Sequence, residues 1–198
     1  MTLKIVQAGS PVLRAAAQPV APDQIRSREV RELIDWMRET MRDAPGVGLA
    51  APQIGLPLQM AVLEDRVELL NSMPADVLAE RGRRPVPFQV LINPRIRTSG
   101  VEVEFFEGCL SLAGYTALVP RSLEVQVDCL DHKGEPLSFR AEGWHARIVQ
   151  HEVDHLNGTL YVDRMRTKSL TSMENLHRYW SDLPVKEVIA KLDGKTTG

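Results

Sequence analysis

Apolar side chains recur along the chain at spacings that predict both helices and strands. Between residues 27 and 42 the spacing is helical, Ser27 is suited to the N-cap, and Pro45-Gly46 stops the pattern, so we predict a helix there. Residues 101–105 and 123–129 instead alternate with period two, which predicts half-buried strands. The apolar stripe of the helix consists of Val30, Leu33, Ile34, Met37 and Met41.

Shorter patterns add further elements to this prediction. Residues 59–63 and 90–96 have the length and composition of strands, and the run from His132 to Glu135 predicts a hairpin turn. A helix is expected from Gly143 to Asn157-Gly158, since Asn-Gly is typical of a helix end. Residues 160–162 are expected to form one more short strand.

The C-terminal tail, about residues 169–192, is predicted to hold another helix. Thr171 and Glu174 have capping-box spacing at its start, and Pro184 ends it. Strands and helices follow one another without a regular βαβ rhythm, which indicates an α+β fold. We therefore predict mixed or antiparallel strands packed around a central helix, followed by a C-terminal helix.

Length and composition limit the class of protein. The 198 residues suit a single domain, 1–198, and the hydrophobic content of 43% is enough for one sizeable core. A formal net charge of -2 gives no general attraction to nucleic acid or to anionic membranes, and no apolar run reaches membrane-spanning length. Having only Cys109 and Cys129 favours a reducing compartment. The acid-free stretch 1–22 is interpreted as mature protein, so we expect a cytoplasmic location.

The sequence His151-Glu152-Val153-Asp154-His155 carries the strongest chemical signal. On a helix its two imidazoles lie one turn apart on one face and can reach one tetrahedral metal ion, with Glu152 beside them as a proton carrier. Cys109, which follows the predicted strand 101–105, can supply a thiolate as the third ligand. The fourth position then stays open for water, as is typical of a catalytic site.

Isolated histidines and cysteines are more often structural than functional. Free cysteine is usually buried, and Cys129, at an inward position of a strand, is interpreted in that way. His151 and His155 differ because they bracket an acid at ligand spacing, although this spacing also arises by chance. Cys109 differs because it follows a glycine at the end of a strand, where its side chain can face a cleft.

Two further segments contain candidate substrate contacts. The loop from Gly46 to Gly55 is rich in small residues and is either only a tight turn or part of a site. Gln53 is its one polar side chain, and a buried amide needs a partner. Trp144 and Ile148 share a predicted helix face with His151, so they form plain core, a pocket wall beside the metal, or both.

Together, the three motifs resemble those of peptide deformylase, the metal hydrolase that removes the N-formyl group from new polypeptides. The resemblance covers about residues 5–165 and includes the segments 117–121 and 143–147, the latter closer to the organelle-type subgroup. It implies a metallo-amidohydrolase that acts on N-formyl-Met nascent peptides. It also implies one divalent metal ion on the three ligands named above, Fe(II) in the working enzyme, with Zn(II), Ni(II) or Co(II) able to replace it.

The resemblance also implies roles for individual residues. A metal-bound water gives its proton to Glu152, and the resulting hydroxide attacks the formyl carbonyl. Gln53 and the backbone N–H of Leu110 stabilise the developing oxyanion, and Glu152 passes the proton to the leaving amine. Main-chain groups of the glycine-rich loop pair with an extended peptide. The substrate contacts implied are Val47, Gly48, Gly108, Trp144 and Ile148.

One part of the chain departs from the compact family pattern, and the tail has two possible roles. An insertion spans about residues 65–88 and includes the basic run 81–85, which we interpret as a solvated loop rather than a binding patch. The tail beyond Lys168 either contacts the ribosome transiently or packs on the core, and packing is favoured. No direct binding to nucleic acid or membrane is expected.

Two other functions fit parts of the same pattern. An HExxH metallopeptidase usually takes its third ligand from downstream of the motif, and the candidates there, Glu174, His177 and Glu187, lie in no ligand motif. A non-catalytic, metal-stabilised binding protein would need a fourth ligand and would leave Glu152 and Gln53 without a role. Formate release from formyl-Met peptides separates both from a deformylase.

Overall fold

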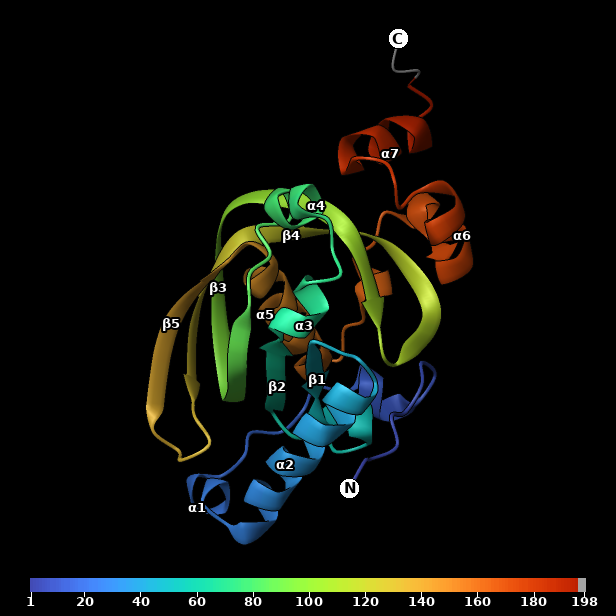
Figure 1. Cartoon of the computed structure of the whole chain (residues 1–198). Helices are drawn as coiled ribbons and strands as arrows, with labels where there is room; N and C mark the ends of the chain where they lie inside the picture. Colours follow the sequence, from blue (N-terminus) through green and yellow to red (C-terminus); the bar gives the residue numbers. More distant parts are fainter. Residues whose placement is uncertain (196–198) are drawn as a thin grey trace.

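One curved antiparallel sheet wraps around a helix in the computed structural model, which describes residues 1–195 (Figure 1). The strand order is β1-β2-β3-β4-β5, with β6 paired to β4 off this path, and every ladder between these strands is antiparallel. The predicted α+β class is confirmed. Residues 196–198 of the predicted domain, 1–198, lie outside the described residues. The strands are β1 (Gly48–Ala50), β2 (Met60–Asp65), β3 (Val86–Cys109), β4 (Leu112–Leu130), β5 (Pro136–Glu142) and β6 (Thr171–Ser172).

Helix α5 (Gly143–Leu156) is the central helix that the prediction required. It contacts strands β1 to β5 and lies inside the curve of the sheet (Figure 1). This helix carries the HExxH motif, so the motif is held by the core of the molecule. The other α-helices are α1 (Pro22–Ile25), α2 (Arg28–Asp43), α3 (Val67–Leu70), α4 (Ala75–Glu80), α6 (Met173–Tyr179) and α7 (Val185–Leu192), and the 3-10 turns are η1 (Pro11–Arg14), η2 (Ala51–Ile54), η3 (Tyr161–Asp163) and η4 (Thr167–Ser169).

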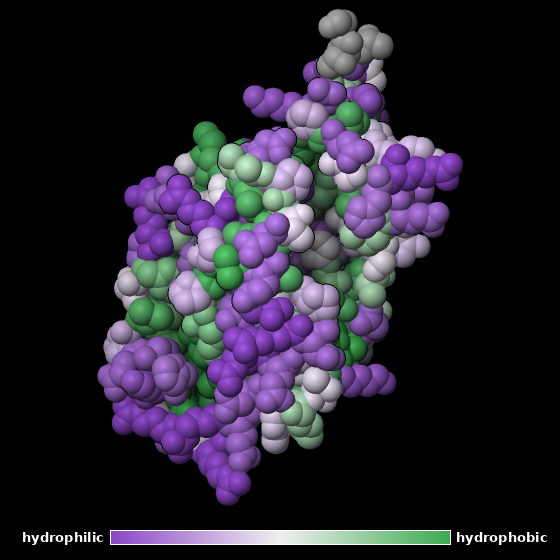
Figure 2. All heavy atoms as spheres, in the orientation of Figure 1, coloured by the Kyte–Doolittle hydropathy of each residue, from purple (hydrophilic) through white to green (hydrophobic). Residues whose placement is uncertain are grey.

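The predicted helix 27–42 is confirmed as α2. The Ser27 side chain accepts a hydrogen bond from the Val30 N–H at 3.2 Å, which satisfies one of the free amides of the first turn. The apolar stripe then packs into a core cluster with β1, β2 and β3, while hydrophilic residues cover the outer surface of this part of the molecule (Figure 2). Buried members of the stripe are Val30, Ile34, Met37 and Met41.

The predicted strands 90–96 and 101–105 are parts of one strand, β3. The prediction of two separate strands was wrong, because the chain continues through an irregularity between them. Gly100 adopts a positive φ of 78° there, and the register against β4 shifts between Ser99 and Glu102. A bulge of this kind bends a strand without ending it. The period-two segment 123–129 likewise belongs to a longer strand, β4, and Cys129 is buried as predicted.

Two predictions downstream of the motif were wrong. Residues 160–162 begin the turn η3 instead of a strand, because the Leu160 N–H donates to the Asp163 carboxylate and the Asp163 N–H donates back to the Leu160 carbonyl. The tail helix is capped by Ser172, whose hydroxyl accepts from the Asn175 N–H, because Thr171 pairs with β4 in β6. Helix α6 ends before Pro184 as predicted, and α7 follows it.

The insertion 65–88 forms helices α3 and α4, and its basic run is not a solvated loop. Arg83 makes a bidentate ion pair with Asp65, whose side chain is fully buried, at 2.7 and 2.9 Å. The Arg81 guanidinium lies over the Trp144 ring. Only Arg84 of these arginines is exposed, so the interpretation as a solvated loop is corrected for Arg81 and Arg83.

The tail packs on the body of the molecule in addition to its strand pairing. Val188 of α7 is buried, and Asp193 accepts a hydrogen bond from Arg166 at 2.8 Å. The Val185 N–H donates to the Glu80 carboxylate of α4, so the tail also contacts the insertion. Among residues 1–195, no helix combines the length and apolarity that a membrane span requires.

Candidate metal centre and adjoining cavity

The structure brings the three predicted metal ligands together. His151 and His155 lie one turn apart on α5 with ring centroids 4.9 Å apart, and Cys109 is the last residue of β3. The Cys109 Sγ lies 3.3 Å from His155 Nε2, and one candidate ligand atom from each of the three residues lies within 4.8 Å of the others. Ligands of a tetrahedral ion at roughly 2.0–2.3 Å are about 3.5 Å apart, so these side chains fit a metal ion.

The carboxylate of Glu107 fixes the orientation of one ligand ring. It lies two residues before Cys109 and contacts His151 Nδ1 at 3.0 Å, which leaves Nε2 as the free ring nitrogen for ligation. Burial opposes ionisation of Glu107, but the hydrogen bond to His151 and the charge and hydrogen bonds of Arg121 outweigh it and hold the pKa well below its usual range. Glu107 is therefore a buried anion behind the candidate metal ligands.

Two arginines neutralise that anion. Arg121 donates to both Glu107 oxygens at 3.0 Å, and Arg147 donates to one of them at 2.6 Å. Arg121 also bonds Asp154 of the HExxH motif, and Arg164 binds the same carboxylate at 2.7 and 2.8 Å. Arg164 is exposed, whereas the other four charged side chains are almost fully buried, and such ions require this degree of pairing.

This network of buried charges was not predicted from the sequence. Asp154 lies inside the HExxH motif and Glu107 lies two residues before Cys109, but nothing local indicates that their partners include Arg121, 14 residues after Glu107, and Arg147. A usable signal was the presence of acids beside both ligand segments, because metal-bound histidines commonly donate to a carboxylate. The missing information was the pairing of β3 with β4, which brings Glu107 opposite Ala117.

Glu152 lies against the glycine-rich loop. Its side chain is buried, and a Cβ on Gly48 would lie 2.1 Å from Oε1, so only glycine leaves room for the carboxylate there. Burial raises the pKa of Glu152 to about 7, and Oε2 has no hydrogen-bond partner among residues 1–195. A carboxyl in this environment can exchange a proton near neutral pH.

Gln53 is also buried, and its amide is oriented from both ends. Oε1 accepts from the Ala50 N–H at 2.8 Å, while Nε2 lies 3.3 Å from Ser111 Oγ and 3.5 Å from Cys109 Sγ. The buried amide thus has the hydrogen-bond partners that its burial requires, and it lies beside the candidate ligand Cys109. Leu110 follows Cys109 in the chain, and its carbonyl oxygen accepts a hydrogen bond from the Gln7 side chain at 3.0 Å.

A cavity of about 720 Å³ opens beside these side chains. All the predicted substrate contacts line it, and it adjoins strand β1, which ends the strand order and, among residues 1–195, pairs with β2 alone. The cavity wall also contains residues that the sequence did not indicate, among them Tyr115 of β4 and Met173 of α6. The predicted residues in its lining are Val47, Gly48, Gln53, Gly108, Cys109, Leu110, Trp144, Ile148, His151 and Glu152.

The family model of polypeptide deformylase matches residues 2–170 of this chain. The chain is 47% identical to the chloroplastic peptide deformylase 1A of Solanum lycopersicum over 95% of its length, and it spans 66% of that relative. Peptide deformylase 1 of Streptomyces coelicolor is 46% identical over 90% of this chain and 80% of the relative. These relatives come from a plastid and a bacterium, so the compartment stays a prediction.

Among solved structures, the chain is similar to a Met-Ala-Ser bound class I type b peptide deformylase from Acinetobacter baumannii. The TM-score is 0.74 with 32% sequence identity, and the match covers 83% of this chain and 99% of the other. Residues 171–195, which form β6, α6 and α7, lie beyond the family-model match, although Met173 among them lines the cavity.

Proposed function

Because the chain belongs to the polypeptide deformylase family, we propose that it removes the N-formyl group from the N-terminal formylmethionine of newly made polypeptides and releases formate. This is hydrolysis of a linear amide, the reaction of class EC 3.5.1.88. One observation carries the proposal. Glu152 and Gln53 lie in the same cavity as the candidate ligands Cys109 and His151, so a proton carrier and a hydrogen-bond donor adjoin the metal centre.

We assign Cys109, His151 and His155 as ligands of one divalent ion. The family implies Fe(II), while two imidazoles and a thiolate also suit Zn(II), Ni(II) or Co(II). Bound there, the ion supplies Lewis acidity toward the formyl carbonyl and lowers the pKa of the attacking water. Glu107 supports this assignment because it holds the His151 ring by Nδ1.

Glu152 is the proton carrier of the reaction. Its raised pKa, about 7, suits a group that takes a proton from water and then returns one to a leaving amine. Water oxygen forms a bond to the formyl carbon, the carbon–nitrogen bond breaks, and the proton held by Glu152 goes to the nitrogen. The products are formate and a peptide with a free N-terminus.

Gln53 and the backbone N–H of Leu110 are the proposed oxyanion donors. The Gln53 Nε2 group carries two hydrogens, of which one is donated to Ser111 Oγ at 3.3 Å and the other is directed at Cys109 Sγ at 3.5 Å. The contact with sulfur is the weaker one, and a substrate carbonyl oxygen bound beside Cys109 would replace it as the acceptor. Because Oε1 is fixed by the Ala50 N–H, the donor is oriented before substrate binds.

The substrate would enter as an extended chain along the loop that precedes β1. Gly48 and its neighbour Val47 line the cavity, and β1 has one unpaired side in the described strand order, so main-chain groups there can pair with a peptide. Trp144 and Ile148 would receive the unbranched methionine side chain, and Gly108 lies on the cavity wall at the end of β3.

The structure gives little support to the two competing functions, a metallopeptidase and a non-catalytic metal-stabilised binding protein. A metallopeptidase with a downstream ligand would need Glu174, His177 or Glu187 near the motif, yet Glu174 and His177 are exposed on α6 and Glu187 lies on α7. Within residues 1–195, the candidate ligand group contains three residues, so the closed four-ligand site of a structural metal protein also lacks support.

The experiment is anaerobic purification, metal analysis and a formate-release assay on formyl-Met-Ala-Ser. Acetyl-Met-Ala-Ser is the matched control, because it differs only in the acyl group. We expect formate and a free Met-Ala-Ser peptide from the first and no product from the second. Folded, metal-loaded protein that releases no formate would refute the proposal, and cleavage of an internal peptide bond would favour a metallopeptidase.

A transient ribosome contact through the tail remains a secondary proposal. Helix α6 has no buried residue, so its surface is available, whereas β6 and Val188 of α7 hold the tail on the core. Co-sedimentation of the whole chain with ribosomes, compared with a variant whose exposed α6 residues Arg178 and Tyr179 are replaced by alanine, tests it. Equal recovery of both proteins would argue against a contact there.

A further inference from the structure

Three arginine side chains surround the indole ring of Trp144. The guanidinium carbons of Arg81, Arg83 and Arg147 lie 5.1, 5.3 and 5.6 Å from the ring centroid, within the range of cation–π contact. Phe105 adds an edge contact with its ring centroid 6.2 Å away. Such a set of contacts restricts the orientation of the ring.

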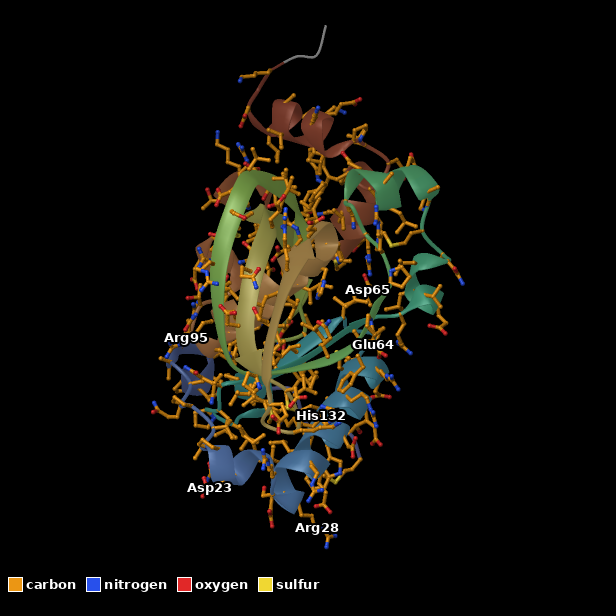
Figure 3. The ribbon with its side chains drawn as sticks, turned by 90° about the vertical axis from the view of Figure 1, so that its left-hand side faces the viewer. Asp23, Arg28, Glu64, Asp65, Arg95 and His132 are labelled. Atoms are coloured by element: carbon orange, nitrogen blue, oxygen red, sulfur yellow. The ribbon has the colours of Figure 1, made fainter. Side chains whose placement is uncertain are left out.

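Arg81 and Arg83 reach Trp144 from outside the cavity. Trp144 and Arg147 line the cavity, whereas Arg81 and Arg83 are absent from its lining. Both belong to the insertion between β2 and β3. In Figure 3 the label Asp65 marks the start of this insertion, and the two green helices near the label are α3 and α4. The insertion therefore backs one wall of the cavity.

The insertion is itself firmly attached at this point. Arg83 is held by its bidentate pair with the buried Asp65 at the end of β2. The backbone of Gly82 packs on the first residue of α5, since a Cβ on Gly143 would lie 2.6 Å from the Gly82 carbonyl oxygen. Trp144 comes next in the chain, so the loop and the ring are fixed relative to each other.

Arg81 is the informative member of the group. Its Nε atom is buried and has no hydrogen-bond partner among residues 1–195. Within the same residues, Arg81 forms no ion pair, in contrast to Arg83. Its close contact is therefore the aromatic ring. A half-buried arginine kept for general stability would be expected to have a carboxylate partner, as Arg83 does.

We propose that the insertion determines which first side chain the cavity accepts, with Arg81 and Arg83 as positioning residues that hold Trp144 against that side chain. The proposal rests on the proposed function in one respect, that the cavity receives the side chain of the formylated residue. Without the arginines the ring can move, and the cavity should then bind methionine less tightly and admit bulkier side chains.

The test compares Arg81→Ala with Arg84→Ala, a matched control in the same basic run whose side chain is exposed. Activity is measured on formyl-Met-Ala-Ser and formyl-Phe-Ala-Ser. For Arg81→Ala we expect KM for the methionine peptide to rise about three- to tenfold while kcat changes less than about twofold, because the ring is not among the reacting groups. The ratio of kcat/KM for the methionine peptide to kcat/KM for the phenylalanine peptide should fall by a similar factor. Arg84→Ala should match the wild type.

A second readout does not depend on activity. Trp36 and Trp180 are replaced by phenylalanine, which leaves Trp144 as the one tryptophan, and its fluorescence quenching by acrylamide is measured. Arg81→Ala should increase quenching, and Arg81→Lys, which keeps a cation, should restore part of the wild-type value. Arg81→Gln serves in both assays should the alanine variant be unstable.

The outcomes separate this proposal from the proposed function. Unchanged peptide preference together with unchanged quenching in Arg81→Ala would overturn it, as would a fall in kcat with the preference intact. If the wild type released no formate, the proposed function would fail, while the quenching of Trp144 would still report whether Arg81 holds the ring.

Discussion

A Cβ built on Gly48 would lie 2.1 Å from Oε1 of Glu152, far inside the contact distance of two non-bonded atoms. The φ of Gly48 is not positive, so its backbone does not demand glycine and the constraint is the neighbouring carboxylate. Gly48→Ala should therefore displace Glu152 and lower formate release at least about tenfold. The displacement should also cost about 1–3 kcal/mol of unfolding free energy, which thermal denaturation measures.

The double variant Gly48→Ala/Glu152→Ala is the control for this interpretation. If alanine at position 48 acts only by pushing on the Glu152 carboxylate, then Gly48→Ala should have almost no effect once that carboxylate is gone. The double variant should therefore turn over at nearly the same rate as Glu152→Ala alone. Additive losses of activity in the double variant would show that Gly48 has an independent role, for example in binding the peptide backbone.

Glu152→Ala should keep its metal and fold but lose nearly all deformylation. A general base contributes on the order of a hundred- to ten-thousand-fold, and here the same carboxyl also returns the proton. The melting temperature should fall little in Glu152→Gln, because Oε2 is buried without a partner among residues 1–195. Metal-loaded Glu152→Ala with near-normal turnover would remove Glu152 from the mechanism.

Cys109→Ser should bind metal at least about tenfold more weakly, because a hydroxyl stays protonated and is a poorer, harder ligand. Cys129→Ser is the matched control, since its buried position raises the pKa of that thiol to about 11 and keeps it away from metal chemistry. It should change the melting temperature alone. Metal content of the purified variants is the measurement, and dependence on Cys129 in place of Cys109 would show the ligand assignment to be wrong.

Gln53→Leu should lower kcat more than it raises KM, because the proposed bond forms to charge that develops during attack. Removing one oxyanion donor costs about 3–4 kcal/mol, or roughly a hundred- to thousand-fold in rate. The structure adds a second effect, because the Ala50 N–H loses its acceptor and stability should fall by about 1–3 kcal/mol. A raised KM with intact kcat would make Gln53 a substrate-positioning residue.

Local pattern was sufficient for much of this fold. The stripe from Val30 to Met41 predicted α2, and the period-two segments predicted parts of β3 and β4, because side-chain periodicity follows directly from which face is buried. The HExxH spacing likewise placed His151 and His155 on one face of α5. Cys109 was predicted as the third ligand from its place after a glycine at the end of a strand, but only the fold shows how close it lies to the histidines.

What the sequence did not predict depends on contacts between distant segments. Glu107 meets Arg121 because β3 and β4 form one long hairpin, and Arg83 meets Asp65 because the insertion folds back on the strand it leaves. Residues 160–162 have the composition of a strand, yet Asp163 closes a turn around them. Charged residues carry no periodic signal for such partners, so only the fold reveals them.

The two ends of the sheet differ in how they guard against self-association. An unpaired strand edge invites pairing with another copy of the chain, which leads to aggregation. At one end, β5 carries Pro136 and the exposed charges Arg140 and Glu142, and these discourage such pairing. At the other end, β1 is only three residues long, so its edge has room for the short extended peptide that we propose as substrate but too little length for a second sheet. A short edge of this kind would be open to the proposed substrate and would still be a poor template for fibrils.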